Sequence, residues 1–132
     1  MNKLIKIIST ILVIMMFAGC GASKLSSDFS QEKLKSSVET VIDNLNNEKY
    51  DDIVKNGSQD LKSKLTAEQL KNSWSNMKDK VGDFDSISKE VFTDRDGNAT
   101  VIVAAKYEKG NVQFTVSYNK STEIIGIHMA NS

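Results

Sequence analysis

The chain has 132 residues, with 17 basic and 17 acidic side chains and no formal net charge. This length allows one small domain, and the balanced charge argues against a partner such as nucleic acid that binds by neutralisation of its phosphates. A single cysteine, Cys20, excludes an intramolecular disulfide.

The first nineteen residues have the pattern of an export signal. Lys3 and Lys6 precede an apolar run over residues 7–17. This run is too short to cross a hydrocarbon core about 30 Å thick as a stable helix. The pattern therefore favours a signal peptide over residues 1–19 rather than a membrane-spanning anchor.

The segment Phe17-Ala18-Gly19-Cys20 resembles the lipobox of bacterial lipoproteins, although Phe17 stands where leucine is usual. The resemblance implies cleavage before Cys20 and lipidation of its thiol. The mature chain would then be anchored to the outer face of the cytoplasmic membrane. Residues 20–29 are predicted to form a flexible tether. An ordinary signal peptide with a chance cysteine is the alternative.

Four helices are predicted next. Apolar residues at helical spacing indicate an amphipathic helix over residues 30–47. A short helix over residues 50–55 ends at Asn56-Gly57, and residues 58–65 form another short helical segment. The sequence Thr66-Ala67-Glu68-Gln69 is a capping box that opens a fourth helix, which ends at Gly82. One face of this helix carries Ala67, Leu70, Trp74, Met77 and Val81.

After Gly82 the apolar spacing changes to the period of two that is typical of strands. Strands are predicted over residues 84–93, 99–107, 112–118 and 123–129, with short polar turns between them. Residues 30–132 are therefore predicted to form one α+β domain, with N-terminal helices packed on a four-stranded antiparallel meander.

Several segments resemble known domains. Residues 44–51 are similar to the "leucine, short polar run, tyrosine-aspartate" joint of nuclear transport factor 2-like domains. Residues 65–70 with Trp74, and residues 107–110 leading into 114–116, resemble the domain of unknown function family 3887 within that superfamily. The resemblance implies a curved sheet wrapped around the helices as a cone, often with an interior pocket. Relatives occur on lipoproteins of Gram-positive bacteria.

Two interpretations of the apolar residues stay open. They could line a pocket for a small apolar ligand or fill the core between helices and sheet. The candidate lining residues are Trp74, Met77, Phe92, Phe114, Tyr118 and His128. Strand alternation places His128 on the same face as Ile124 and Gly126, where it could pair with a carboxylate as an acid–base group. The alternative is a surface histidine.

Other chemical motifs are weak. Residues 94–98 begin like a calcium loop, but the glycine is misplaced and a hairpin turn is favoured. The carboxylate pairs Asp51-Asp52 and Asp83/Asp85 flank helix ends, where acids are commonly solvated. No nucleophile elbow, phosphate loop or zinc motif is present, so neither a cofactor nor a metal is predicted.

Three functions remain open. The favoured one is a non-catalytic accessory or binding module at the membrane face, monomeric or weakly dimeric, with a small apolar ligand or an envelope protein as its partner. The second is a protein–protein interaction module that uses its sheet. The third is a small enzyme that uses an acid–base group in the cone pocket.

Overall fold

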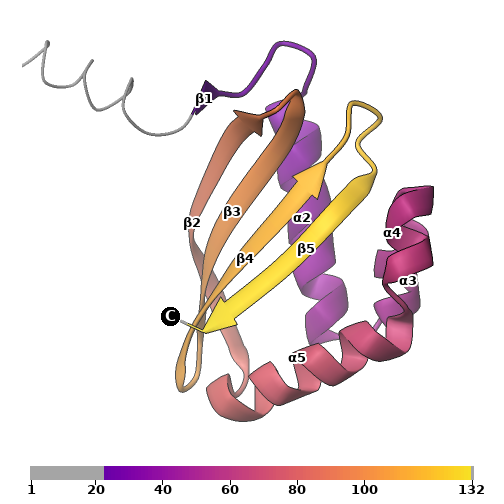
Figure 1. Cartoon of the computed structure of the whole chain (residues 1–132). Coiled ribbons are helices and arrows are strands. Elements are labelled where there is room, and N and C mark those ends of the chain that lie inside the picture. Colours follow the sequence, from indigo (N-terminus) through magenta and orange to yellow (C-terminus); the bar gives the residue numbers. More distant parts are fainter. Residues whose placement is uncertain (1–22, 132) are drawn as a thin grey trace, which may run out of the picture.

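The computed structural model describes residues 23–131. The predicted signal peptide over residues 1–19 and the lipidation site Cys20 lie outside this part of the chain. Helices come first and strands follow, in the predicted order (Figure 1).

The four predicted helices are present. They are α2 (Gln31–Asn46), α3 (Tyr50–Lys55), α4 (Gln59–Lys64) and α5 (Ala67–Val81). Each begins and ends within about two residues of its predicted bounds.

Side-chain caps explain where three of these helices start. The Ser30 and Ser58 hydroxyls accept hydrogen bonds from backbone N–H groups in the first turns of α2 and α4. At α5, Thr66 Oγ1 accepts from Gln69 N over 3.1 Å, and Thr66 N donates to Gln69 Oε1 over 3.0 Å. The predicted capping box is confirmed. Gly82 ends α5 with a φ of 78°, a conformation that favours glycine.

The predicted four-stranded meander is also present. Its strands are β2 (Phe84–Arg95), β3 (Asn98–Tyr107), β4 (Gly110–Tyr118) and β5 (Ile124–Asn131), and each pairs antiparallel with the next. The structure confirms the α+β class.

A fifth, very short strand precedes the helices. β1 (Ser23–Lys24) pairs with Thr93 and Asp94 on the edge of β2, and the partly buried side chains of Leu25 and Phe29 pack against the core. Residues 23–29 therefore contact the domain in the described part of the chain, where a flexible tether over residues 20–29 was predicted. Two apolar side chains and an unpaired strand edge offered contacts that the polar composition of the segment did not indicate.

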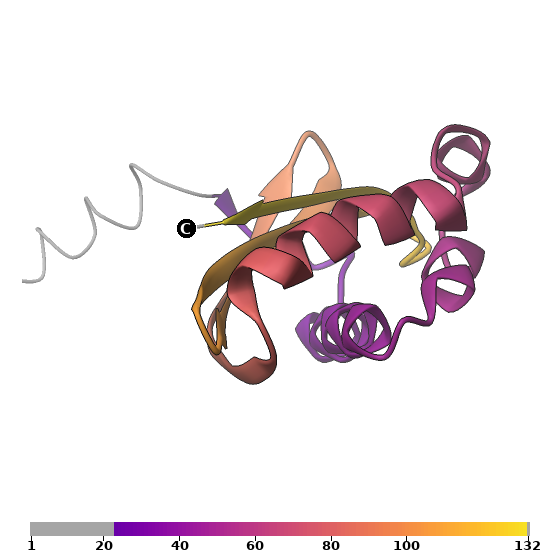
Figure 2. The same cartoon turned by 90° about the horizontal axis from the view of Figure 1, so that it is seen from below.

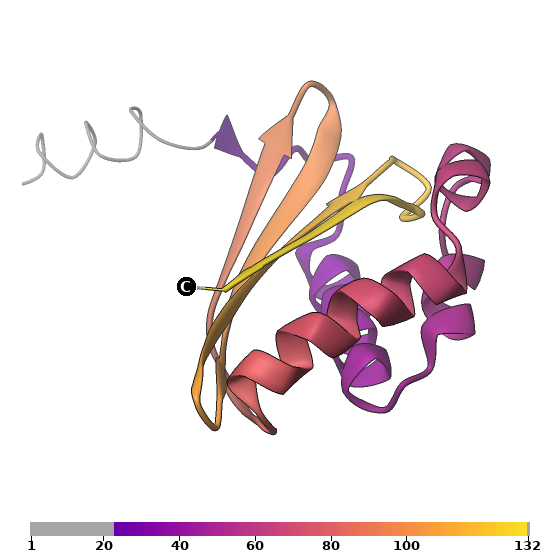
Figure 3. The ribbon, with the colours of Figure 1, turned by 60° about the horizontal axis from the view of Figure 1, so that its bottom comes forward.

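All four helices lie on one side of the sheet, which Figures 2 and 3 show from below. The core fills the space between the two layers. Its largest fully buried side chains are Trp74, Tyr118, Phe114, Leu34, Ile42, Leu45, Ile53 and Ile124. Among the described residues, no helix covers the opposite face of the sheet.

A bulge changes the register of the last strand. Ser117 pairs with Gly126, whereas the next residue, Tyr118, pairs with Ile124, so Ile125 has no partner across the ladder. One extra residue in a strand reverses the face of every side chain beyond it.

This bulge separates His128 from Ile124, with which simple alternation had grouped it, and agrees with the alternative of a surface histidine. Ile124 lies on the helix-facing side of the sheet together with Ile127 and Met129, while His128 pairs with Thr115 on the opposite, open face. The His128 side chain is exposed. Simple alternation, which does not account for a bulge, had grouped His128 with Ile124.

Candidate functional site

A cleft of about 450 Å³ lies where three parts of the chain meet: the second half of α2, the joint between α3 and α4, and the turn between β4 and β5. Figure 3 shows this turn on the same side of the sheet as α4. The volume is within the range of small-molecule sites. The lining residues are Ser37, Thr40, Val41, Asn44, Lys55, Asn56, Gly57, Lys62, Ser121, Thr122 and Glu123.

Two backbone hydrogen bonds hold the α3–α4 joint against the start of β5. Ile124 N donates to Asn56 O over 3.0 Å, and Ser58 N donates to Ile124 O over 2.9 Å. Gly57 forms a parallel bridge with Ile124 between these bonds. A Cβ atom at Gly57 would lie 2.7 Å from Leu61 Cδ2 and 3.1 Å from the carbonyl oxygen of Val54. The close approach of Leu61 and of the Val54 carbonyl oxygen to this position therefore requires a glycine.

The predicted helix end at Asn56-Gly57 is thus only half right. Asn56 is the C-cap of α3, with a φ of −86°, and Gly57 does not take the left-handed conformation of a helix-ending glycine. Instead, Gly57 leaves room for Leu61 and the Val54 carbonyl oxygen, which a side chain at this position would crowd.

The β4–β5 turn is ordered by the side chain of Asn119. Asn119 Oδ1 accepts hydrogen bonds from Ser121 N over 3.0 Å and from Glu123 N over 2.9 Å. Asn119 Nδ2 donates to Glu123 Oε1 over 2.9 Å. Thr122 has a φ of 61°, an unusual backbone conformation for a β-branched residue. These hydrogen bonds order the turn, whose residues Ser121, Thr122 and Glu123 line the cleft.

The charged groups of the cleft are two lysines and one glutamate. Within residues 23–131, neither Lys55 nor Lys62 forms an ion pair. One carboxylate oxygen of Glu123 already accepts the hydrogen bond from Asn119. The described lining thus has an excess of positive charge, carried by two lysine ammonium groups that are hydrogen-bond donors.

Tyr118 lies beneath this cleft. Its side chain is fully buried, and its hydroxyl has no hydrogen-bond partner in the described part of the chain. Burial raises the pKa of Tyr118 to about 12, and the nearby Ser37 hydroxyl partly opposes this shift. Ser37 lines the cleft. Natural proteins rarely leave a buried polar group without a hydrogen-bond partner, because this costs free energy. The Tyr118 hydroxyl is therefore an unusual feature next to the cleft.

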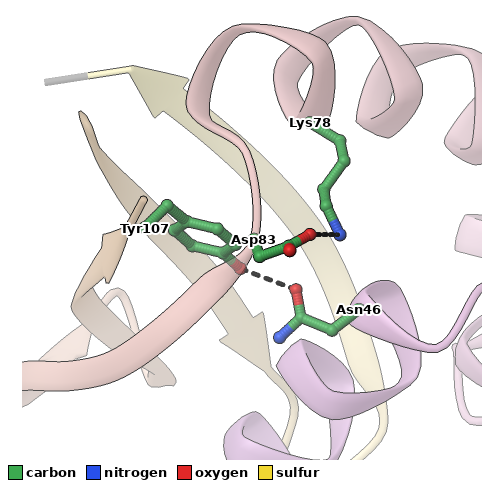
Figure 4. A network of polar contacts seen from close by, with 4 residues as sticks. All are labelled: Asn46, Lys78, Asp83 and Tyr107. Carbon is green, nitrogen blue, oxygen red and sulfur yellow. Dashed lines mark hydrogen bonds and ion pairs between the residues drawn. The ribbon is translucent and has the colours of Figure 1, made fainter. Parts of the chain in front are cut away.

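A second cavity, of about 270 Å³, lies between α2, α3 and α5 and is lined in part by Asn46, Trp74 and Lys78. The Tyr107 hydroxyl donates to Asn46 Oδ1 over 2.9 Å, and Lys78 Nζ lies 3.7 Å from an Asp83 carboxylate oxygen. Figure 4 shows the two pairs next to each other. Burial raises the pKa of Tyr107. In each pair, the two polar groups are partners of each other, which is typical of contacts that stabilise a fold.

The predicted pocket residues have other positions. Trp74 and Phe114 pack together with ring centroids 5.7 Å apart, and both are almost completely buried. Met77 and Phe92 are partly buried against the same core. Of the six candidates, Trp74 borders the second cavity and Tyr118 lies beneath the cleft, while His128 is on the far face of the sheet. The structure does not bring the six together around one pocket.

Two further features are absent from the described residues. No group of three or more histidine, cysteine or acidic side chains in this part of the chain is arranged to hold a metal ion. Among the described helices, none is sufficiently long and apolar to cross a membrane.

The layers and strand order define a class of small α+β domains in which helices cover one face of an open antiparallel sheet. The chain belongs to the family "Protein of unknown function (DUF3887)", whose pattern matches residues 38–127. A solved protein from Ruminococcus gnavus ATCC 29149, studied by NMR, has a similar fold, with a TM-score of 0.70 and 24% identity. The match covers 82% of this chain and 97% of that one. No curated protein matches.

Sequence reasoning missed most of the cleft. Lys55, Lys62 and Thr122 come from separate short segments, and each by itself has the appearance of an ordinary surface residue. The parallel bridge between Gly57 and Ile124 brings these segments together, and no local sequence pattern predicts such a bridge.

Proposed function

We propose that this protein is a lipid-anchored, non-catalytic binding module at the outer face of the bacterial cytoplasmic membrane, with a fold of the nuclear transport factor 2-like type. The anchor is inferred from the lipobox-like segment that ends at Cys20. The fold assignment is supported by the open antiparallel sheet with helices on one face.

The observation that carries the binding function is the cleft between α2, the α3–α4 joint and the β4–β5 turn. It is lined by polar side chains from separate elements, and the ordered turn fixes part of its shape. Its ligand would be polar rather than apolar, because the described lining residues of this cleft are mostly polar and include no aromatic side chain.

The position of His128 favours binding over acid–base catalysis. The histidine lies on the open face of β5, across the sheet from the cleft. General acid–base work requires the titrating group within hydrogen-bond reach of the substrate, directly or through one water.

The anchor can be tested in cells of the native host. The full chain is expected to incorporate labelled palmitate and to partition with the membrane. Cys20→Ala should lose both properties, while Ser27→Ala, a change at an exposed position of the same segment, should retain them as the matched control. Membrane retention of the Cys20→Ala protein, or an intact Met1 on the wild-type protein, would contradict the anchor.

The binding function is tested by native mass spectrometry of the full chain extracted from its own envelope. The wild-type protein should carry a bound small molecule. Thr40→Trp, which fills the cleft from α2, should remove it, whereas Thr115→Trp on the open sheet face should not. An adduct that survives Thr40→Trp, or a wild-type protein without any adduct, would count against the proposal.

A further inference from the structure

We infer that the cleft binds a small oxyanion, a carboxylate or phosphate group on a polar molecule, through Lys55 and Lys62, with the buried hydroxyl of Tyr118 acting through Ser37. This inference rests on the proposed binding function and names the class of its ligand. Three separate observations support it.

The first observation is the charge of the lining. Lys55 and Lys62 come from different helices and line the same cleft. No acidic side chain among residues 23–131 forms an ion pair with either one. Within the described part of the chain, Glu123 is the one acidic residue of the lining, and its Oε1 atom already accepts from Asn119. The charge left for a ligand is therefore positive, which favours an anion.

The second observation is the presence of charged and hydroxyl donors in the lining. Lysine ammonium groups only donate hydrogen bonds, and the hydroxyls of Ser37 and Ser121 can also donate. The oxyanion of a carboxylate or phosphate only accepts, and accepts most strongly from charged donors. The cleft and an oxyanion are therefore complementary in hydrogen bonding as well as in charge.

The third observation is the unpartnered hydroxyl of Tyr118. This phenol is completely buried at the end of β4 and has no partner in good hydrogen-bond geometry among the described residues. The Ser37 hydroxyl, which lines the cleft, is close enough to oppose part of the rise in the Tyr118 pKa. Natural proteins rarely leave such a group unsatisfied. An acceptor bound in the cleft would reach this phenol through the Ser37 hydroxyl, because Ser37 lines the cleft and Tyr118 lies behind it.

The test uses the full, isotope-labelled chain in nanodiscs of phosphatidylcholine, with amide NMR signals as the readout. Glycerol 3-phosphate and citrate are the probes, and uncharged glycerol is the control. Either probe should shift the amide signals of residues 55–57 and 121–123 saturably, and glycerol should not. Nanodiscs of phosphatidylglycerol without a probe show whether a lipid headgroup can supply the same phosphate.

Variants locate the contact. Lys55→Gln and Lys62→Gln should each weaken probe binding about tenfold, the loss expected for one charge-assisted hydrogen bond. Lys109→Gln changes an exposed lysine in the β3–β4 turn and should leave the affinity unchanged. Tyr118→Phe should also weaken binding; unchanged affinity in this variant would remove Tyr118 from the proposed site.

Other outcomes separate this inference from the proposed function. If glycerol shifts the same signals as strongly as glycerol 3-phosphate, or if Lys109→Gln weakens binding as much as the cleft variants, the oxyanion assignment is wrong. The same holds if neither the probes nor the lipid produces saturable shifts. An uncharged adduct in native mass spectrometry that Thr40→Trp removes would still uphold the binding function.

Discussion

The hydroxyl of Tyr107 on β3 donates a hydrogen bond of 2.9 Å to Asn46 Oδ1 at the end of α2 (Figure 4). This contact joins the helical layer to the sheet across 61 positions of sequence. The Tyr107 ring also packs edge-on against Trp74, with centroids 5.7 Å apart. The pair therefore helps to fix the position of α2 over the sheet.

Removal of this hydroxyl should destabilise the fold. We expect Tyr107→Phe to lower the free energy of unfolding by about 1 kcal/mol, because Asn46 loses its partner in a partly buried position. Chemical denaturation of the wild-type and variant proteins measures the difference. A variant as stable as the wild type would show that the contact contributes nothing.

Tyr118 gives the opposite expectation in the absence of ligand. Its buried hydroxyl has no hydrogen-bond partner in the described chain, so Tyr118→Phe should leave the stability unchanged or raise it by up to about 1 kcal/mol. Replacement of tyrosine by phenylalanine is therefore expected to lower the free energy of unfolding at position 107 but not at position 118. A loss of stability comparable to that in Tyr107→Phe would mean that Tyr118 has a structural partner.

Glu90 predicts a pH dependence of stability. Its Oε2 atom is buried without a hydrogen-bond partner among the described residues. Partial burial raises its pKa above 4.5, the adjacent Glu39 of α2 raises it further, and Lys35 partly opposes this shift. Because the folded state favours the protonated acid, its stabilisation is complete below pH 4.5 and is lost as pH rises through the higher folded pKa.

Glu90→Gln should therefore raise the free energy of unfolding at pH 8 and change it less at pH 4. Glu32→Gln, an exposed change in the first turn of α2, is the matched control and should not stabilise the protein at pH 8. Denaturation curves at both pH values measure the effect. If both variants respond alike, Glu90 is not the source of the pH dependence.

Two glycines distinguish close packing from open space. We expect Gly57→Ala to lower stability by about 1–3 kcal/mol, because its Cβ would crowd Leu61 and the carbonyl of Val54. At Gly126 in β5, a Cβ would meet only Ser117 Cβ at 4.0 Å. Gly126→Ala should be neutral or slightly stabilising. Melting temperatures of the two variants give the comparison, and equal values would contradict it.

The sequence by itself determined the elements and their order. The cap at Thr66, the glycine at position 82 and the change from helical to strand spacing are local signals, and each acts within a few residues of itself. The same holds for the turn at Asp96-Gly97, where both residues have positive φ. Such signals are sufficient for an α+β assignment, because that class follows from the sequence of elements.

Only the tertiary structure decided which residues meet. The extra residue in β5 moved His128 to the open face, and the bridge at Gly57 gathered Lys55 and Lys62 around the cleft. The burial of the Tyr118 hydroxyl likewise depends on where α2 rests over the sheet. These outcomes arise from pairings between distant segments, and a shift of one residue in such a pairing reverses the face of each side chain without changing the local pattern.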